Sequence, residues 1–351
     1  MDSRLSELTR WVEQVFQNEA RPLSTQWSCK VVSGDASFRR YFRVSDAGRS
    51  WIAVDAPPEK EDSRPFVEVA EAWLPLSVSV PDIMATDLER GFMLLEDFGD
   101  LQYLAELTPQ SADQLYSLAL DELVKIQGCR SLNGRDLPPY DQAMLMREMM
   151  LFCDWFLQQL LGLELSPKEQ AALEQLFHAL AVSALAQPQV CVHRDFHSRN
   201  LMLCEDGRTG VIDFQDAVMG PVTYDLVSLL RDCYISWPDD DVERWVAAFV
   251  ERLKQRPSMQ AIESNQFKTW FDLMGMQRHL KAVGIFARLN IRDGKAAYLQ
   301  DIPRTFTYLI KVGGQYPAFQ PVVAWFEAVV VPAMVQSELF DNAQMQRWLK
   351  P

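Results

Sequence analysis

The chain has 351 residues, 48% of them hydrophobic and 23% charged, and it carries a formal net charge of −14. This composition is ordinary for a globular protein, and the length favours two domains or two lobes. The acidic balance argues against nucleic acid and anionic membranes as partners, because both attract basic proteins. It does not exclude ATP, since magnesium and backbone amides can offset the charge of phosphate groups.

The distribution of cysteines and apolar residues predicts a soluble, cytoplasmic protein. The six cysteines are scattered without a C-x-x-C pair, which favours free thiols in a reducing compartment over a disulfide framework or a zinc site. Apolar residues between Leu5 and Phe16 recur at helical spacing with charged residues between them, so we expect a surface helix rather than a signal peptide. No apolar run approaches the roughly 20 residues that span a bilayer.

The N-terminal part of the chain that follows this helix is predicted to be rich in strands. We expect strands over residues 28–32, 37–44, 51–54 and 92–95, and a helix over 66–73. Turn residues at 33–35 and 45–48 separate the first three strands. The last strand runs into residues 96–100, which we interpret as the connector between two lobes.

From about residue 100 the periodicity of apolar residues is mostly helical. Ser166 with Glu169 predicts a helix start with a capping box, and Ser111 with Gln114 is a weaker version of the same device. Short strands are expected over 189–192 and 210–212, and later helices over 224–234, 240–253, 266–289 and 321–330. We therefore predict an α+β, bilobal, protein-kinase-like fold. It has a strand-rich, nucleotide-binding N-lobe (1–96), a larger helical C-lobe (97–351) and an ATP cleft between them.

The most informative motif runs from His193 to Asn200 and reads H-R-D-F-H-S-R-N, with Asp213 thirteen residues after its end. An acid, an amide and a second acid at this spacing are what phosphoryl transfer from ATP requires. Asp195 would accept a hydrogen bond from the acceptor hydroxyl and place it in line with the γ-phosphorus. Asn200 and Asp213 would hold Mg²⁺ through oxygen atoms, the ligands that a hard cation prefers. The motif therefore predicts a kinase-type site.

The histidines of the motif, and Asp225 after it, admit interpretations other than a direct role in phosphoryl transfer. His193, Asp195 and His197 alternate, so on a strand they would point the same way and bind zinc, but a zinc site would leave the amide and the second acid without a role. We prefer to interpret His193 as a buried histidine that supports the loop through a backbone hydrogen bond. Asp225, at the start of a predicted helix, is expected to cap that helix or to bond the loop backbone rather than to take part in the chemistry.

Two segments are candidates for contacts with the nucleotide. Residues 32–40 form a predicted hairpin, either an ordinary turn or one whose small residues let backbone amides approach phosphate oxygens. The connector would offer backbone groups to the adenine edge. The candidate nucleotide-binding residues are Ser33, Gly34, Ser37, Arg40, Glu96 and Phe98.

Together these motifs resemble the aminoglycoside phosphotransferase-like kinase family over nearly the whole chain. Within that family, the chain is most similar to kinases that phosphorylate the anomeric hydroxyl of N-acetylmuramic acid and N-acetylglucosamine in cell-wall (peptidoglycan) recycling. The stretches that carry this similarity are 55–62, 95–100, 275–280 and 301–304. The resemblance implies ATP and Mg²⁺ as cofactors and an amino sugar as the substrate.

The spacing of basic residues late in the chain provides candidates for substrate contacts. Arg278, His279, Lys281 and Arg288 fall on one predicted helix, where they either face the substrate or form a solvated face. N-acetylmuramic acid carries a carboxylate, which needs a local cation in an acidic protein. The candidate substrate-binding residues are His197, Arg199, Arg231 and Arg278.

One departure from the family pattern concerns the third strand, which lacks the lysine that such kinases pair with a helix glutamate to hold the phosphates. Candidates to replace the pair are Lys60, Arg40 or Arg43 as the cation, and Glu68 or Glu71 as the acid. The missing lysine leaves open a nucleotide-binding scaffold without catalysis, although a scaffold would not need the acid–amide–acid motif.

Two other kinase classes compete with the amino-sugar interpretation. A kinase of the same fold that acts on an aminoglycoside, an amino alcohol or homoserine stays open. A protein kinase is less expected, because Gly220-Pro221 arrives within seven residues of Asp213 and leaves little room for a peptide platform.

Overall fold

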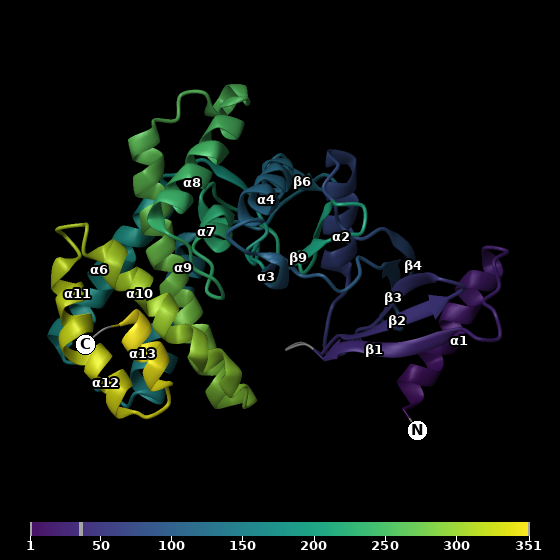
Figure 1. Cartoon of the computed structure of the whole chain (residues 1–351), viewed down its shortest axis with the longest axis horizontal. Coiled ribbons are helices and arrows are strands. Elements are labelled where there is room, and N and C mark those ends of the chain that lie inside the picture. The colour runs from purple at the N-terminus through teal and green to yellow at the C-terminus, as the bar shows by residue number, and fades with distance from the viewer. Residues whose placement is uncertain (1, 35–37, 350–351) are drawn as a thin grey trace. The chain divides into compact units, whose positions relative to one another are not determined.

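The computed structural model describes residues 2–34 and 38–349, and the chain forms two compact units (Figure 1). The first unit takes in residues up to 106 together with 131–136 and 199–216. The second takes in 107–130, 137–198 and the chain from 217 onward. The chain thus leaves the first unit after residue 106 and returns to it at 131–136 and at 199–216. The lobe boundary predicted between residues 96 and 97 stays a prediction.

The first unit is built on a five-stranded antiparallel sheet. In spatial order its strands are β1 (Ser28–Gly34), β2 (Arg40–Asp46), β3 (Arg49–Asp55), β5 (Phe92–Glu96) and β4 (Ile83–Asp87). The predicted strands 28–32, 51–54 and 92–95 lie within β1, β3 and β5, whereas the one predicted over 37–44 begins at Arg40. Strand β4 was missed, because its half-buried side chains show no apolar alternation.

Helix α1 (Ser3–Asn18) covers one face of this sheet. Its apolar stripe, predicted from helical spacing, is buried against side chains of the strands; the buried cluster consists of Leu8, Trp11, Val12, Phe16, Phe42, Val44, Ala53, Phe92 and Leu94. The remaining elements of the unit are α2 (Arg64–Trp73), α3 (Tyr103–Glu106), and two hairpins, β6 (Ser131–Leu132) with β7 (Arg135–Asp136) and β9 (Leu201–Leu203) with β10 (Thr209–Val211). The hairpin β9–β10 positions two of the predicted site residues, as described below.

The second unit is mainly helical, with one short pair of strands, β8 (Gln189–Val192) and β11 (Val218–Pro221). Its helices are α4 (Ala112–Ile126), α5 (Gln142–Leu151), α6 (Pro167–Leu185), α7 (Tyr224–Leu230), α8 (Asp239–Lys254), α9 (Ser264–Asp293), α10 (Ile302–Gly313), α11 (Gln320–Trp325), α12 (Val331–Gln336) and α13 (Asn342–Trp348), with π-helical stretches at Phe152–Leu160 and Phe326–Val330. The sheet in one unit and the helices in the other confirm the predicted α+β architecture.

Helix α9 is the centre of the second unit, with α5, α6, α7 and α10 packed around it. Figure 1 shows α6, α7 and α10 near it. Close packing against α5 requires Gly284, because a Cβ there would lie 2.4 Å from the carbonyl carbon of Leu151. Several polar and charged residues of α9 are nevertheless buried: Asp272, Gln277, Arg278, His279 and Lys281. Buried polar groups in a central helix are unusual unless they have partners or a function.

The two predicted helix caps had different outcomes. At α6 the capping box is confirmed, because the Ser166 side chain accepts from the Glu169 N–H and the Glu169 carboxylate accepts from the Ser166 N–H. At α4 the prediction was wrong, because Ser111 makes no side-chain cap bond. Its hydroxyl instead bonds the N–H and the side chain of Thr108, in the turn before the helix.

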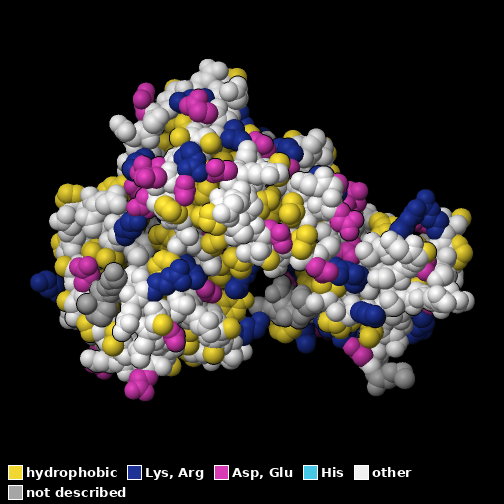
Figure 2. Space-filling model, in the orientation of Figure 1, with side chains coloured by type: hydrophobic (Ala, Val, Ile, Leu, Met, Phe, Trp, Pro, Cys, Tyr) yellow, Lys and Arg dark blue, Asp and Glu magenta, His cyan; other side chains and the backbone are white. Residues whose placement is uncertain are grey.

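The remaining bulk predictions concern cysteines, membrane segments and charge. Within the described residues, which include all six cysteines, no disulfide forms. No helix in the described ranges is both long and apolar enough to cross a bilayer. Acidic and basic side chains are interspersed over the face shown in Figure 2.

Candidate functional site

The loop that follows β8 (residues 193–200, here the 193–200 loop) carries the predicted reactive acid and is anchored at its start by Asp225. This buried aspartate, in the first turn of α7, accepts hydrogen bonds from the N–H of His193 (2.7 Å) and the N–H of Arg194 (3.0 Å). Burial raises the pKa of Asp225 to about 6. Arg194 has a positive φ of 80°, a strained conformation for a residue with a side chain. Asp225 therefore holds the backbone at the point where it is most strained.

Asp232 anchors the other part of the same loop. Its Oδ2 accepts from the Ser198 N–H (2.9 Å) and the Ser198 hydroxyl (2.6 Å), and its Oδ1 accepts from the Tyr234 N–H (3.0 Å). The His197 ring packs edge-on against Tyr234, with ring centroids 5.2 Å apart. Asp232 was not found by sequence reasoning, because no spacing rule connects it to the motif that it supports.

Asp195 lies between these two anchors and is half-buried. Its N–H donates to Nδ1 of the fully buried His193 (3.2 Å), an arrangement that leaves the proton on Nε2 of that ring. Burial acts to raise the pKa of the Asp195 carboxyl, but the charges of Lys281 and other cations outweigh it and lower the pKa. The side chain is therefore an ionised acceptor at neutral pH. No group of three or more His, Cys, Asp and Glu side chains in the described ranges is arranged to hold a metal ion.

A buried ionic network links the loop to two helices of the second unit. Glu148 on α5 lies 2.7 Å from Nη2 of Arg194 and 3.1 Å from Nζ of Lys281 on α9, and it also bonds the Tyr140 hydroxyl. Nζ of Lys281 also donates to the Tyr224 hydroxyl (2.9 Å). One carboxylate thus positions both a loop arginine and an α9 lysine whose charge acts on Asp195. Glu148 has no counterpart in the sequence argument, because it lies more than forty residues from the motif.

The predicted magnesium ligands Asn200 and Asp213 lie together in the first unit. The Asn200 carbonyl oxygen accepts from the Ile212 N–H (3.1 Å), and the Asn200 side-chain amide nitrogen lies 3.3 Å from Oδ2 of Asp213. Asp213, like Arg194, has a positive φ, here 61°. The next residue, Phe214, is fully buried and stacks on Phe66 of α2 at 4.6 Å, which fixes the segment. Asp195 belongs to the other unit and is five residues before Asn200 along the chain.

The donor set at Asn200 and Asp213 fits a magnesium ion. Both side chains supply the amide and carboxylate oxygens that Mg²⁺ prefers, once the Asn200 amide turns its oxygen outward. A third side chain, Gln215, donates to Oδ1 of Asp213 (2.9 Å), and its own amide oxygen is buried with no hydrogen-bond partner. The site therefore holds a buried amide oxygen that a cation or a metal-bound water would satisfy.

The predicted nucleotide-binding residues have varied placements. Ser33 and Gly34 belong to β1 and pair with Tyr41 and Arg40, whereas Ser37 lies outside the described residues. The Glu96 N–H donates to the Asp82 carbonyl oxygen (2.9 Å), and the Glu96 carboxylate lies 3.0 Å from Arg208.

Phe98 is buried, packs with Met202, Cys204 and Ile212, and occupies the space that a side chain at Gly210 would need. The side chains of Glu96 and Phe98 thus support the fold, and the predicted contact of the connector backbone with adenine stays a prediction.

The suggested replacements for the missing lysine have other partners. Arg40 pairs with Asp55 and Asp2, and Arg43 with Asp97 (2.6 Å) and Asp100 (2.8 Å). The ammonium group of Lys60 lies over the Phe38 ring. On the acid side, Glu68 pairs with Arg135 and Glu71 accepts from Asn133. The suggestion that one of these cations pairs with Glu68 or Glu71 was therefore wrong for the described residues.

A different buried cation occupies the neighbourhood of the hairpin turn. Arg39 is 4% exposed and lies 3.2 Å from Glu61, a residue of the segment after β3. Sequence reasoning missed this pair, because two successive arginines at 39 and 40 gave no sign of which one is buried.

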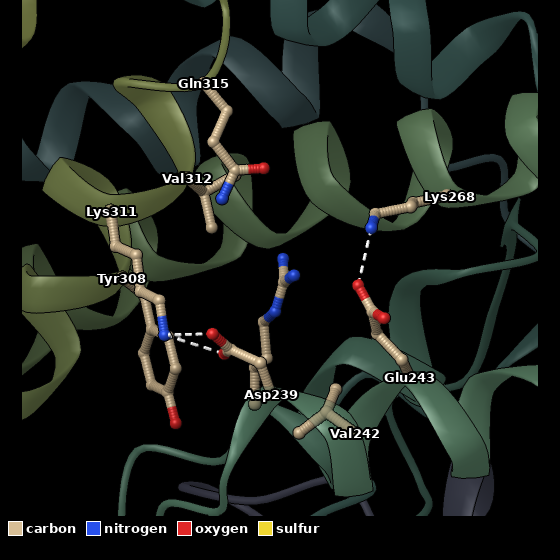
Figure 3. Close-up of a pocket in the computed structure, with 9 residues that line it drawn as sticks. Asp239, Val242, Glu243, Lys268, Tyr308, Lys311, Val312 and Gln315 are labelled. Atoms are coloured by element: carbon tan, nitrogen blue, oxygen red, sulfur yellow. Dashed lines mark hydrogen bonds and ion pairs between the residues drawn. The ribbon is translucent and has the colours of Figure 1, made fainter.

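The candidate substrate-binding residues also differ in their partners and in their burial. Arg231 stacks on Phe271 and pairs with Asp272 (2.6 Å), and it lines a small cavity together with two ion pairs, Lys311–Asp239 and Lys268–Glu243 (Figure 3). Arg199 belongs to the first unit, where its carbonyl oxygen accepts from the Gln102 side chain (3.0 Å). Arg278, His279 and Lys281 are buried, so the alternative of a solvated face was wrong for these three residues.

Comparisons with known proteins agree with this architecture. Residues 28–262 match the model of a family described as "Phosphotransferase enzyme family". The chain is 44% identical to an N-acetylmuramate/N-acetylglucosamine kinase of Pseudomonas putida, covering 90% of this chain and 94% of the relative. It is 38% identical to a protein of the same name from Neisseria meningitidis, covering 92% and 94%.

Solved structures show the same fold at low identity. The Plasmodium vivax ethanolamine kinase superposes with a TM-score of 0.62 at 12% identity, over 90% of each chain. An ADP-bound aminoglycoside phosphotransferase superposes with a TM-score of 0.55 at 12% identity, over 89% of this chain and 99% of that one. With a family model covering most of its length, and relatives of high identity over nearly all of it, the chain belongs to the phosphotransferase enzyme family.

Proposed function

We propose that the chain is an ATP-dependent kinase that transfers a phosphoryl group to the anomeric hydroxyl of N-acetylmuramic acid and N-acetylglucosamine. The product would be the sugar 1-phosphate, made in the cytoplasm during cell-wall recycling. Two relatives with this name at 44% and 38% identity support the choice of acceptor. The observation that carries the chemistry is the position of Asp195 in a loop whose backbone is anchored by the buried acids Asp225 and Asp232.

Asp195 is suited to orient a hydroxyl group rather than to act as a strong base. Its lowered pKa keeps it ionised, so it accepts a hydrogen bond from the anomeric hydroxyl and directs the oxygen lone pair to the γ-phosphorus of ATP. An anomeric hydroxyl is more acidic than an ordinary alcohol, so the Asp195 carboxylate can take up its proton as the new O–P bond forms and the bond from the γ-phosphorus to the bridging oxygen breaks to release ADP.

Asn200 and Asp213 would hold Mg²⁺ through their side-chain oxygens, with Gln215 orienting the Asp213 carboxylate. A bound Mg²⁺ neutralises phosphate charge and fixes the position of the phosphates. The hydrogen bond from Gln215 holds the Asp213 carboxylate, and the stacking of Phe214 on Phe66 holds the backbone beside it. The residues around it therefore supply rigidity, and the reactive loop supplies the acceptor geometry.

The proposal is tested by ATP consumption with Mg²⁺ against N-acetylmuramic acid, N-acetylglucosamine, glucose, kanamycin, choline and homoserine, with the product position determined by phosphorus NMR. We expect turnover of the two acetylated amino sugars to their 1-phosphates. Asp195→Asn should lower kcat by about 10²- to 10⁴-fold while the circular dichroism spectrum is unchanged. Near-normal activity in that variant would contradict the assigned site.

The electrostatics near Asp195 distinguish the amino sugars from one competing class of substrate. An aminoglycoside is polycationic, and the buried cations Lys281 and Arg278 act on the same carboxylate that would receive it. This arrangement favours a neutral or anionic acceptor. Exclusive turnover of kanamycin would therefore contradict both the proposed substrate and this argument.

A further inference from the structure

Arg278 on α9 is a buried arginine whose charge is not matched by a direct carboxylate contact. It is 5% exposed, and its hydrogen bond runs from Nη1 to Sγ of Cys233 (3.4 Å). Within the described part of the chain, no Asp or Glu oxygen lies within the 4.0 Å that defines an ion pair with it. Burial raises the pKa of Cys233, so its neighbour is a neutral thiol and a weak acceptor.

Other arginines of the second unit do have a carboxylate partner. Arg194 pairs with Glu148 at 2.7 Å, Arg231 with Asp272 at 2.6 Å, and Arg304 with Asp301 at 3.0 Å. A buried guanidinium without such a partner costs several kcal/mol, and its planar fork of five N–H donors matches the two oxygens of a carboxylate. The environment of Arg278 is therefore one that a bound carboxylate would complete.

The position of Arg278 relates it to the reacting group. Its charge acts on both Asp195 and Asp232, the proposed acceptor of the sugar hydroxyl and the anchor of the same loop. Lys281, one helical turn further along α9, is already engaged by Glu148 and Tyr224. Of these two α9 cations, Arg278 is the one with donors left for a ligand.

The two proposed sugars differ by one anionic group. N-acetylmuramate is N-acetylglucosamine with a lactyl ether on O3, and this ether ends in a carboxylate two ring carbons away from the anomeric centre. We propose that Arg278 binds this lactyl carboxylate and thereby sets the preference of the enzyme for N-acetylmuramate over N-acetylglucosamine. The inference rests on the proposed function, and it assigns a specificity role that the phosphoryl-transfer chemistry itself does not need.

The test measures kcat/KM for N-acetylmuramate, its methyl ester and N-acetylglucosamine with the wild type, Arg278→Gln and Arg278→Lys. For the wild type, the ester should be about 10- to 100-fold poorer than the acid, the factor expected for a hydrogen bond between charged groups. Arg278→Gln should lower kcat/KM for the acid by the same factor of about 10- to 100-fold and leave kcat/KM for the ester and N-acetylglucosamine unchanged. The three substrates should then have similar kcat/KM values. Arg278→Lys should retain part of the preference, because it keeps the charge without the fork.

A matched control is Arg304→Gln, since Nη1 of Arg304 bonds the Cys233 carbonyl oxygen (2.6 Å) while its charge is paired with Asp301. This variant should leave the ratio between the sugars unchanged. Equal losses on all three substrates in Arg278→Gln would overturn the inference and indicate a positioning role.

Equal use of acid and ester by the wild type would overturn the inference without any variant, even if Arg278→Gln fails to fold. Absence of turnover on every sugar by the wild type would instead refute the proposed function.

Discussion

Replacing Gly284 by alanine is expected to separate α9 from α5 and to destabilise the second unit. A Cβ at this position would lie 2.4 Å from the carbonyl carbon and 2.6 Å from the carbonyl oxygen of Leu151. Ordinary contacts begin at 3.4 Å, so relief requires a shift of about 1 Å (3.4 − 2.4) between two packed backbones. Overpacking of this kind costs about 1–3 kcal/mol, and a backbone neighbour has no rotamer with which to yield.

Gly275 on the same helix provides a matched control. A Cβ there meets Nη1 of Arg231 at 3.3 Å, the end of a flexible side chain rather than backbone. Both substitutions gain about 1 kcal/mol of helix propensity. We therefore expect Gly275→Ala to be neutral or more stable by up to about 1 kcal/mol, and Gly284→Ala to be about 1–3 kcal/mol less stable than Gly275→Ala, a difference that isolates the packing cost.

Urea unfolding followed by tryptophan fluorescence measures this difference, and the chain has ten tryptophans to report it. Activity provides a second observable, because α5 and α9 also carry Glu148 and Lys281, whose charged atoms lie 3.1 Å apart. Gly284→Ala should lower kcat as well as stability. Equal stabilities for the two variants, within about 0.5 kcal/mol, would refute the packing argument.

Three further predictions concern charged groups of the site. Burial raises the pKa of Asp225 to about 6, so the folded protein binds this proton more tightly than the unfolded chain does. The resulting gain in the free energy of unfolding is complete below the ordinary aspartate pKa and is lost as the pH rises through about 6. Asp225→Asn should remove this pH dependence, which is worth roughly 3 kcal/mol between pH 4 and 7. The pKa shift would be contradicted if the unfolding free energies of wild type and variant changed equally over this pH range. Glu148→Gln leaves Lys281 and Arg194 without their anion and should cost about 3–5 kcal/mol in urea unfolding, an effect that a Lys281→Met background should reduce. Asp213→Asn should raise the Mg²⁺ concentration for half-maximal activity by about 10-fold or more, whereas an unchanged Mg²⁺ titration would remove Asp213 from the metal site.

The parts of the fold that the sequence predicted are those with local signals. Strands β1, β3 and β5 and helix α1 follow from the spacing of apolar residues, and the start of α6 follows from two side chains that bond each other's backbone. Strand β4 has half-buried residues without alternation, so its place at the sheet edge depends on pairing with β5 rather than on its own pattern. The π-helical stretch Phe152–Leu160 likewise has no period that distinguishes it from the α-helix before it.

The candidate site likewise has a part that the sequence predicts and a part that only the fold reveals. Asp195, Asn200 and Asp213 lie within one short segment, so their chemistry could be inferred from spacing. Their supports come from distant helices. Glu148 and Asp232 are single acids in a chain with 48, and only the fold shows that each bonds the loop.

Helix α9 shows why the basic residues were the hardest part to interpret. Its sequence mixes apolar and charged residues with little amphipathic pattern, which is compatible with a solvated face or with burial on all sides. The structure resolves the ambiguity, because Arg278, His279 and Lys281 are buried together while Lys281 and Arg231 have carboxylate partners. Burial lowers the pKa of His279 to about 3, so this neighbour of Arg278 is neutral and adds no competing charge. Asp195 and Asp232 act on the charge of Arg278 without forming an ion pair with it, so its guanidinium keeps donors for a ligand, and a comparison of the two sugars tests whether that ligand is the substrate carboxylate.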